Sequence, residues 1–386
     1  MKKVGWTSIA PIFADVVMSP WNLLVGGLLI KYLSTPIAVL SIIIGYLFLS
    51  ILFIYYGGIG YKKKQQSSEI ISGVLNSKIT KYLIPSILAI GQIGWASINI
   101  ELGGKSLAYI LSSPIIIGMI LYALFLIMMA ALNLYKMGIV KLFITLSSIG
   151  LLIYVFISKL ATVSLSNFII YVPKIEHSLL WGISIVVASL ISFTTVTPDF
   201  FQSIRSKKDI ILSSIFGLFL PGIITALLGC FLFFDKNNFD LIILISALTF
   251  PIFPHILNAL TNTDGSIAIY TPALKLKSMF KIDKELGIII AAVISLSLAL
   301  IRVSTYLEIW LNILSLLFPS FIGIVLVTYL IKDQKEKQSF AKYSFVIYIL
   351  SIIISIGLTK YFPSVLFSLI SPIILFKLYY YLKNKF

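Results

Sequence analysis

The sequence predicts an all-α integral membrane protein, and three observations carry this prediction. Of its 386 residues, 59% are hydrophobic and only 11% are charged, whereas soluble domains carry about 25% charged residues. Four stretches are long enough to cross a bilayer and contain no charged residue: 36–56, 178–198, 210–234 and 309–331. The few ionisable residues deep in apolar segments stand beside signals of broken helices. A water-soluble core could not hide this much apolar surface.

Short loops connect the apolar segments, so residues 1–386 are expected to form a single transmembrane domain. We expect twelve membrane-spanning helices, at 9–30, 35–57, 82–100, 113–135, 140–158, 178–198, 210–234, 241–270, 286–301, 309–331, 341–359 and 361–381. The ninth of these is short, and the eighth contains Pro251 and Pro254. The N-terminal segment lacks the cleavage pattern of a signal peptide, so we expect it to remain as the first span.

The basic residues are distributed unevenly between the two sides of this arrangement. Counted along the expected spans, 23 of the 30 lysines and arginines fall on one side. The positive-inside rule then places both termini in the cytoplasm and the protein in the cell membrane. The net charge of +16 does not indicate nucleic-acid binding, because the lysines are spread over short loops and are not gathered on one face.

Motifs of metal sites and of common catalytic sites are missing from the sequence. It has one cysteine, Cys230, and two histidines, His177 and His255, which exclude a disulfide framework and a multi-histidine metal centre. It also has no nucleophile elbow and no phosphate-binding loop. We therefore expect the protein not to be an enzyme and to need no cofactor other than a coupling ion.

Two helix breaks occur at matching positions along the chain, in residues 18–22 of span 1 and residues 192–199 of span 6. Proline removes a backbone donor, and clustered Ser, Thr and Asn side chains satisfy the backbone groups that a break frees. Each break lies in the first span of a five-span block, 9–158 and 178–331, and additional helices follow at 341–381. Because five is odd, the second block is inverted, which predicts a LeuT-type 5+5 inverted repeat with a binding site at the membrane midplane. The alternative is a pair of ordinary proline kinks.

Span 3 carries a polar face at the depth of this expected site. Gln92, Trp95 and Asn99 are spaced i, i+3 and i+7, so they share one face of a helix. An amide offers a donor and an acceptor to the edge of a planar heterocycle, and an indole offers a stacking surface. With Asn22 at the first break, these residues are candidates for substrate binding. The alternative is a helix-packing face with Trp95 at the membrane interface.

Span 8 carries oxygen atoms at the spacing of a cation site. The backbone carbonyl of Asn258 and the side-chain oxygens of Thr261 and Asn262 stand at i, i+3 and i+4, and hard cations take oxygen ligands. Backbone carbonyls of an unwound span 1, at Val17 and Pro20, could complete the shell. The alternative is a hydrogen-bonded polar patch between helices.

These motifs resemble those of the bacterial cytosine permeases in the nucleobase:cation symporter family. The family reads Gln-Val-Gly-Trp in its third helix, where residues 92–95 read Gln-Ile-Gly-Trp. Its sixth helix has Thr-Leu-Thr-Ala-Asp-Phe, where residues 195–200 read Thr-Val-Thr-Pro-Asp-Phe. Its eighth has Leu-Asn-x-x-Thr-Thr-Asn-Asp, where residues 257–264 read Leu-Asn-Ala-Leu-Thr-Asn-Thr-Asp. A Pro-Pro-containing stretch of its tenth helix is similar to residues 318–323, Phe-Pro-Ser-Phe-Ile-Gly.

The resemblance implies roles for individual residues. It implies a base-binding set of Gln92, Trp95, Ser189, Leu190, Ser192 and Phe193. It implies a sodium site of Asn258, Thr261 and Asn262 with the span 1 carbonyls. The chain departs from the family at Leu190, where an aromatic residue is usual and for which Phe193 could substitute, and at Thr263 and Gly265, which replace amide-bearing positions.

Resemblance and pattern together predict a secondary active transporter that imports a nucleobase, cytosine-like or another planar heterocycle, by alternating access. The coupling cation is expected to be Na⁺ or H⁺, and the protein is expected to act as a monomer surrounded by membrane lipid. Spans 1, 2, 6 and 7 would rock against spans 3, 4, 8 and 9. The alternatives are a symporter of the same fold for an amino acid or other small organic solute, and a membrane sensor that binds without transport.

Overall fold

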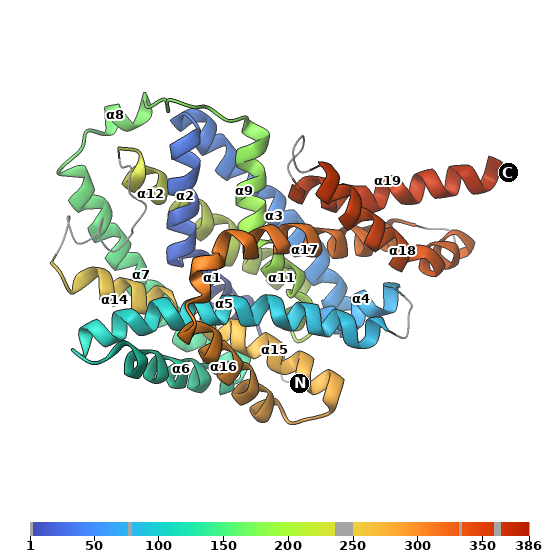
Figure 1. Ribbon diagram of the computed structural model, residues 1–386, viewed down its shortest axis with the longest axis horizontal. Helices are drawn as coiled ribbons and strands as arrows, with labels where there is room; N and C mark the ends of the chain where they lie inside the picture. Colours follow the sequence, from blue (N-terminus) through green and yellow to red (C-terminus); the bar gives the residue numbers. More distant parts are fainter. Residues whose placement is uncertain (1–2, 76–78, 236–249, 332–333, 359–363, 386) are drawn as a thin grey trace.

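The computed structural model describes residues 3–75, 79–235, 250–331, 334–358 and 364–385 (Figure 1). Within these ranges the chain is predominantly helical, and the β structure is an isolated bridge between Val4 and Ile204. This bridge ties the N-terminal segment to the loop that follows the sixth expected span.

The first half of the chain contains the first five expected spans. Helices α1 (Trp6–Val17) and α2 (Pro20–Tyr32) make up the first span and are bent by 49° at the break between them. They are followed by α3 (Thr35–Lys63), α4 (Ser67–Leu75), α5 (Thr80–Ile110), α6 (Ile115–Ala131), α7 (Leu134–Leu160) and the short α8 (Leu165–Ile169).

The second half begins with another broken pair, α9 (Leu179–Thr195) and α10 (Pro198–Phe201). The seventh expected span is continuous through α11 (Lys207–Ser214), the π-helix η1 (Ile215–Phe219) and α12 (Leu220–Phe233). The remaining elements are α14 (Phe253–Thr261), α15 (Gly265–Phe280), α16 (Lys284–Leu300), the 3₁₀ turn η2 (Val303–Tyr306), α17 (Leu307–Leu330), α18 (Gln334–Leu358) and α19 (Ser364–Lys385).

The helices carry apolar outer faces that suit a bilayer. On α3, Leu40, Ile43, Leu47 and Ile51 are exposed at intervals of three or four residues, which places them on one side of the helix. Among the described residues, five helices are long and apolar enough to cross a membrane, and the bent pair α1–α2 makes a sixth span. Other expected spans, such as α6 and α9, are shorter apolar helices. The chain is a multi-pass helical membrane protein, and the number twelve stays a prediction.

The eighth expected span is placed differently in the structure. The predicted range was 241–270, of which 241–249 lie outside the described residues. The structure instead has α14 and α15 running to Phe280, with a break between them that the sequence analysis did not predict. The predicted end was wrong because hydropathy assigns the lysines after residue 270 to a loop. Lys275 is fully buried inside α15, where an ion pair compensates its charge.

The third expected span is longer than predicted for a similar reason. Helix α5 continues to Ile110, ten residues beyond the predicted end at residue 100. Glu101 and Lys105 lie in this extension and pair across one helical turn. Paired side chains at i and i+4 support a helix, so two opposite charges do not end the span here.

Three helix breaks satisfy their own backbone with nearby side chains. At the first, the Asn22 amide donates to the carbonyl of Val17 over 2.8 Å. At the second, the Thr197 hydroxyl donates to the carbonyl of Thr194 over 2.8 Å. At the third, the Ser266 hydroxyl donates to the carbonyl of Thr263 over 2.8 Å. The polar side chains at each break therefore add hydrogen bonds to carbonyls at the interruption, and the carbonyls of Thr194 and Thr263 also accept backbone N–H groups three residues on.

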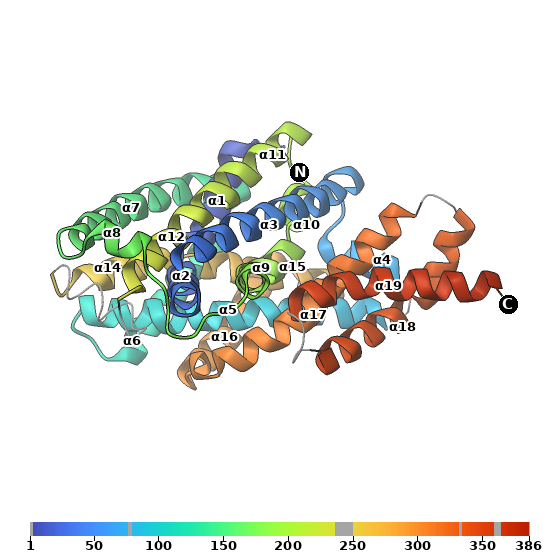
Figure 2. The ribbon, with the colours of Figure 1, turned by 90° about the horizontal axis from the view of Figure 1, so that it is seen from above.

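The breaks and the continuous helices are held together by a small set of helix–helix contacts. Helix α1 packs on α7, α2 on α12, and α9 on both α3 and α17. Helix α5 packs on α6, α14, α15 and α16, and α15 packs also on α6 and α16. Helices α18 and α19 pack on each other and on α17 at one end of the molecule, on the right in Figures 1 and 2. The three breaks, in α1–α2, α9–α10 and α14–α15, therefore lie on elements that pack against one another or against α5.

Candidate functional site

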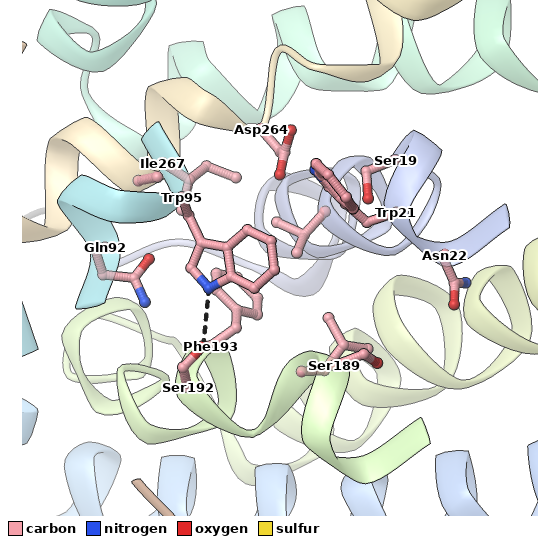
Figure 3. Close-up of a pocket in the computed structure, with 13 residues that line it drawn as sticks. Ser19, Trp21, Asn22, Gln92, Trp95, Ser189, Ser192, Phe193, Asp264 and Ile267 are labelled. Atoms are coloured by element: carbon pink, nitrogen blue, oxygen red, sulfur yellow. Dashed lines mark hydrogen bonds between the residues drawn. The ribbon is translucent and has the colours of Figure 1, made fainter. Parts of the chain in front are cut away.

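A cavity lies where the first and third helix breaks meet α5 and α9 (Figure 3). Its lining residues are Val16, Ser19, Trp21, Asn22, Gln92, Trp95, Ser189, Leu190, Ser192, Phe193, Asp264, Ile267 and Ala268. The two interrupted spans thus supply Ser19 and Asp264 from the breaks themselves and further residues from the adjoining helix ends, and α5 and α9 supply the opposite walls.

Seven of the eight residues proposed for substrate binding line this cavity. The structure brings together Asn22, Gln92, Trp95, Ser189, Leu190, Ser192 and Phe193. The eighth, Asn99, is fully buried but does not line the cavity. It packs instead against Gly265, where a Cβ would come within 2.8 Å of the Asn99 side chain. Asn99 therefore supports the start of α15 behind the site.

Two indole rings form the aromatic wall of the cavity. Trp21 meets Trp95 edge-on, with ring centroids 5.9 Å apart and an interplanar angle of 63°. The Trp95 ring is held in place by a hydrogen bond from its Nε1 to the Ser192 hydroxyl, 3.2 Å long (Figure 3). Phe193 lines the cavity too, but its ring packs on Phe13 with a centroid separation of 5.4 Å. Trp95 is therefore the fixed stacking surface of the site.

Three buried polar atoms around the cavity lack a partner in the described part of the chain. They are Trp21 Nε1, Gln92 Nε2 and Asp264 Oδ1. A buried donor or acceptor left unpaired costs about 1–3 kcal/mol, so such atoms together in one cavity indicate a bound partner. Two are donors and one is a carboxylate acceptor, a set that pairs with a molecule offering both carbonyl oxygen and N–H groups.

The cavity has the size of a small ligand. Its volume accessible to water is about 50 Å³. One water needs about 10–15 Å³ of such volume and takes about 30 Å³ of liquid, so there is room for about four waters, or about 120 Å³ of ligand. A single substituted ring fits this space, and a much larger solute needs the walls to move.

Asn22 acts as a clamp on the first break. Its Nδ2 donates to the carbonyls of Val17 and Gly222, at 2.8 and 2.9 Å, and its Oδ1 accepts the Tyr46 hydroxyl at 2.6 Å. Both amide hydrogens are therefore used within the protein. Asn22 lines the cavity while its amide holds α2 to α12 and α3.

The residues proposed for a cation site are engaged with one another. The Asn258 carbonyl accepts the backbone N–H and the Nδ2 of Asn262, and the Asn258 amide donates to Ser106 at 2.8 Å. The Thr261 hydroxyl donates to its own helix at Leu257, over 2.7 Å. In span 1, the Val17 carbonyl is taken by Asn22, and Pro20 opens α2. The Oδ1 of Asn262, by contrast, is buried and has no hydrogen-bond partner among the described residues, so the sodium site stays a prediction.

A buried lysine lies at the junction where the sequence analysis expected the ion. Lys141 of α7 is fully buried, pairs with the Asp15 carboxylate of α1 and donates to the Thr263 carbonyl over 2.6 Å. Lys141 is one of the 23 basic residues that were expected at the membrane surface on one side, and that expectation is wrong for this residue. The signal was present, since Lys141 falls inside the expected span 140–158, and a charge within a span points to a specific partner.

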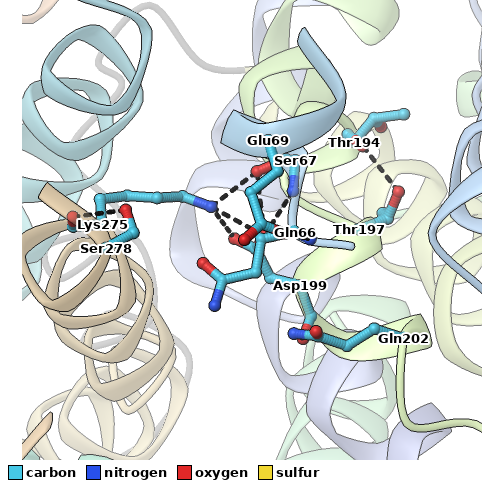
Figure 4. A network of polar contacts seen from close by, with 9 residues as sticks. All are labelled: Gln66, Ser67, Glu69, Thr194, Thr197, Asp199, Gln202, Lys275 and Ser278. Atoms are coloured by element: carbon cyan, nitrogen blue, oxygen red, sulfur yellow. Dashed lines mark hydrogen bonds and ion pairs between the residues drawn. The ribbon is translucent and has the colours of Figure 1, made fainter. Parts of the chain in front are cut away.

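A second buried lysine joins the sixth and eighth expected spans (Figure 4). Lys275 of α15 lies 2.6 and 2.7 Å from the two carboxylate oxygens of Asp199 in α10. Ser67 of α4 completes the cluster, with its backbone N–H donating to Asp199 over 2.8 Å and its hydroxyl accepting from Lys275 over 2.7 Å. The carboxylate beside the second break is therefore part of an ion pair and does not line the cavity.

The fold is that of known secondary transporters. A search against protein-family models finds no match to this chain, and no curated protein sequence matches it. Solved structures do match. The expected resemblance to nucleobase:cation symporters is confirmed in the fold, because structures of one such transporter superpose on nearly the whole chain.

Three of these structures illustrate the match. Mhp1, a nucleobase-cation-symport-1 family transporter in a closed conformation with bromovinylhydantoin bound, is 15% identical, with a TM-score of 0.83 over 97% of this chain and 91% of its own. The inward-facing conformation of Mhp1 gives a TM-score of 0.77 at 15% identity, over 97% of this chain and 90% of its own. A substrate-bound, outward-open Na⁺-coupled sialic acid symporter gives 0.71 at 14% identity, over 96% and 88%. At these identities the likeness concerns the fold.

Proposed function

We propose that this protein is a secondary active transporter that imports a nucleobase or a similar planar heterocycle through alternating access. The observation that carries the proposal is the cavity, which combines a fixed indole surface with unpaired donors and an unpaired carboxylate oxygen. A flat ring stacked on Trp95 would present its edge to Gln92 and Asp264. A lactam edge, with a carbonyl oxygen beside an N–H group, or an amidine edge, with an imine nitrogen beside an N–H group, satisfies both residues.

The pattern of helix packing supports an inverted repeat. If the first five spans map onto the next five, the pair α1–α7 corresponds to α9–α17, and α2–α12 corresponds to α10–α3. Likewise, α5–α6 corresponds to α15–α16, and α5–α16 corresponds to α15–α6. Every one of these pairs is in contact. Such a repeat supports rocking of one group of helices against the other around a fixed site.

The likeness to Mhp1 adds support, because that protein holds a hydantoin, a small planar ring, in its closed conformation. The sialic acid symporter shows that the same fold also carries a substrate of a different kind. An amino-acid or other small organic solute symporter is therefore the second candidate. The aromatic wall and the small cavity favour a ring over an open-chain solute. For a cation-coupled importer, both Na⁺ and H⁺ are candidates, and we propose that the termini face the cytoplasm.

Equilibrium competition binding on the purified protein tests the proposed substrate class. Radiolabelled cytosine is offered with unlabelled cytosine, uracil, hydantoin or an amino-acid mixture as competitors. We expect the planar rings to compete and the amino acids not to compete. Trp95→Ala should abolish this binding, while Trp181→Ala is the matched control, because Trp181 stacks on His177 at the start of α9 and does not line the cavity. Binding displaced by amino acids and insensitive to Trp95→Ala would contradict the proposal.

A further inference from the structure

Lys141 occupies a defined position between the first and eighth expected spans. Its ammonium contacts two oxygen-bearing partners on two other segments: it pairs with Asp15 and donates to the Thr263 carbonyl. The Thr263 hydroxyl in turn donates to Asp15 over 2.9 Å. Asp15 stands two residues before the end of α1, and Thr263 stands in the break between α14 and α15. Lys141 thus links the last turn of α1 and the α14–α15 break from a third helix.

This is the junction in which a coupling cation was expected. The sequence analysis placed that cation between carbonyls of the unwound span 1 and oxygens of span 8. The ammonium provides there what such an ion provides: a positive charge and up to three directed contacts to oxygens. Of the oxygens proposed for the ion, those of Val17, Asn258 and Thr261 take part in hydrogen bonds within the protein, whereas Asn262 Oδ1 is buried without a partner among the described residues.

The charges of Lys141 and Asp15 balance each other, and the Asp264 carboxyl group is a further acidic group close to both. Lys141 and Asp15 form a pair in which both side chains are at most 2% exposed. A sodium ion placed against the same oxygens would face a like charge at contact distance in a medium of low polarity, which is strongly unfavourable. The ammonium and the metal ion therefore exclude each other at this place.

We infer that Lys141 is a built-in replacement for a coupling sodium ion, so that α1 and the α14–α15 break are held together without Na⁺. The inference rests on the proposed function in taking the protein as a carrier of this fold. Of the two coupling cations considered above, Na⁺ and H⁺, the inference removes Na⁺. A carrier with an ammonium fixed in this position does not draw on a sodium gradient.

The thermal stability of the purified full-length protein tests this without any substrate. The melting temperature is measured in choline chloride and in NaCl at equal ionic strength, with the single buried thiol of Cys230 as the reporter of unfolding. A ligand that binds only the folded state raises the melting temperature in a saturable way. We expect the wild-type protein to melt at the same temperature in both salts. A saturable rise specific to Na⁺ in the wild type overturns the inference.

The wild type is expected not to respond to Na⁺, whereas a variant without the Lys141 ammonium is expected to respond. Lys141→Ala leaves Asp15 and Thr263 without their cation, so we expect a lower melting temperature in choline and a recovery of about 2 °C or more in NaCl. Lys159→Ala is the matched control, because Lys159 is also on α7, is 1% exposed and pairs with Asp235 at 2.6 Å. It should lose stability without recovery by Na⁺. A folded Lys141→Ala protein that ignores Na⁺ overturns the inference.

A double variant is included because Lys141→Ala alone leaves a buried carboxylate and can fail to fold. Asp15→Asn combined with Lys141→Ala removes both charges, and we expect it to fold and to show no response to Na⁺. A response of the double variant equal to that of Lys141→Ala would overturn the assignment of the site to Asp15. If Lys141→Ala cannot be purified in either salt, the wild-type comparison decides alone. Because no substrate enters these measurements, their failure is separate from a failure to bind nucleobases.

Discussion

Lys275 and Asp199 form a fully buried ion pair that ties α15 to α10, with the lysine Nζ 2.6 Å from one carboxylate oxygen. Helices α15 and α10 follow the third and second helix breaks, so the pair joins the segments that come after two of the breaks. Ser67 of α4 donates two hydrogen bonds to the other carboxylate oxygen, Oδ1. The pair therefore fixes one side of the molecule, and under the proposed rocking motion it has to separate before that side opens.

Replacing only one of the two paired residues should destabilise the protein strongly. Lys275→Met leaves the Asp199 carboxylate buried and without its counter-charge, which costs about 3–5 kcal/mol. The double variant Asp199→Leu with Lys275→Met removes both charges and should recover most of this loss. Melting temperatures of the wild type, the two single variants and the double variant form a cycle that isolates the pairwise energy. Additive losses would show that the pair contributes little.

The clamp at Asn22 gives a second prediction. Asn22→Asp keeps the shape of the side chain but replaces both donated hydrogen bonds by repulsion between oxygens, at Val17 and Gly222. We expect a loss of about 2–4 kcal/mol, since each buried group left unpaired costs about 1–3 kcal/mol. Tyr46→Phe removes a single bond to the same amide and should cost about 1 kcal/mol. Equal melting temperatures for Asn22→Asp and Tyr46→Phe would argue against the clamp.

The stacking wall gives a third prediction. Trp95→Ala should weaken ligand binding at least about tenfold, because stacking adds about 0.5–1.5 kcal/mol to the area that the ring covers and each 1.4 kcal/mol is about tenfold. The fold should survive, since the Trp95 ring borders a cavity. Affinity is measured by competition binding and folding by gel filtration. Unchanged affinity would remove Trp95 from the site.

The unpaired polar atoms give a fourth prediction. Gln92→Met and Asp264→Asn each remove a partner for the ligand edge while keeping the volume of the side chain. We expect each to weaken binding, by about tenfold or more for Asp264→Asn, because a hydrogen bond to a charged group contributes about 1.5–3 kcal/mol. Asp283→Asn, at an exposed position before α16, is the control for a lost carboxylate. Affinities equal to those of the control would show that the ligand does not use these atoms.

Much of the fold follows from the sequence, because the signals involved are local. The apolar stretches predict the helices, and the prolines at residues 20 and 198 mark two of the three breaks. The third break, at residues 262–264, has no proline and was missed. Its turn consists of i to i+3 bonds that begin at Asn262 and Thr263, and these depend on packing against α5 and α7.

The candidate site could be predicted in part for the same reason. Gln92 and Trp95 were found because helical spacing places them on one face, and they line the cavity. Lys141 and Lys275 were expected at the membrane surface, since hydropathy counts a charge without its partner. Their partners, Asp15 and Asp199, lie more than 70 residues away along the chain. A pairing over that distance exists only in the folded structure.

Gradient-driven uptake of radiolabelled cytosine into proteoliposomes tests the central claim most directly. The vesicles carry an imposed proton gradient, a sodium gradient or none, and unlabelled planar bases or amino acids serve as competitors. The account predicts accumulation that planar bases block, that Trp95→Ala abolishes and that a sodium gradient does not drive. Absence of uptake and of competition by any base, with uptake of another solute through the same cavity, would contradict it.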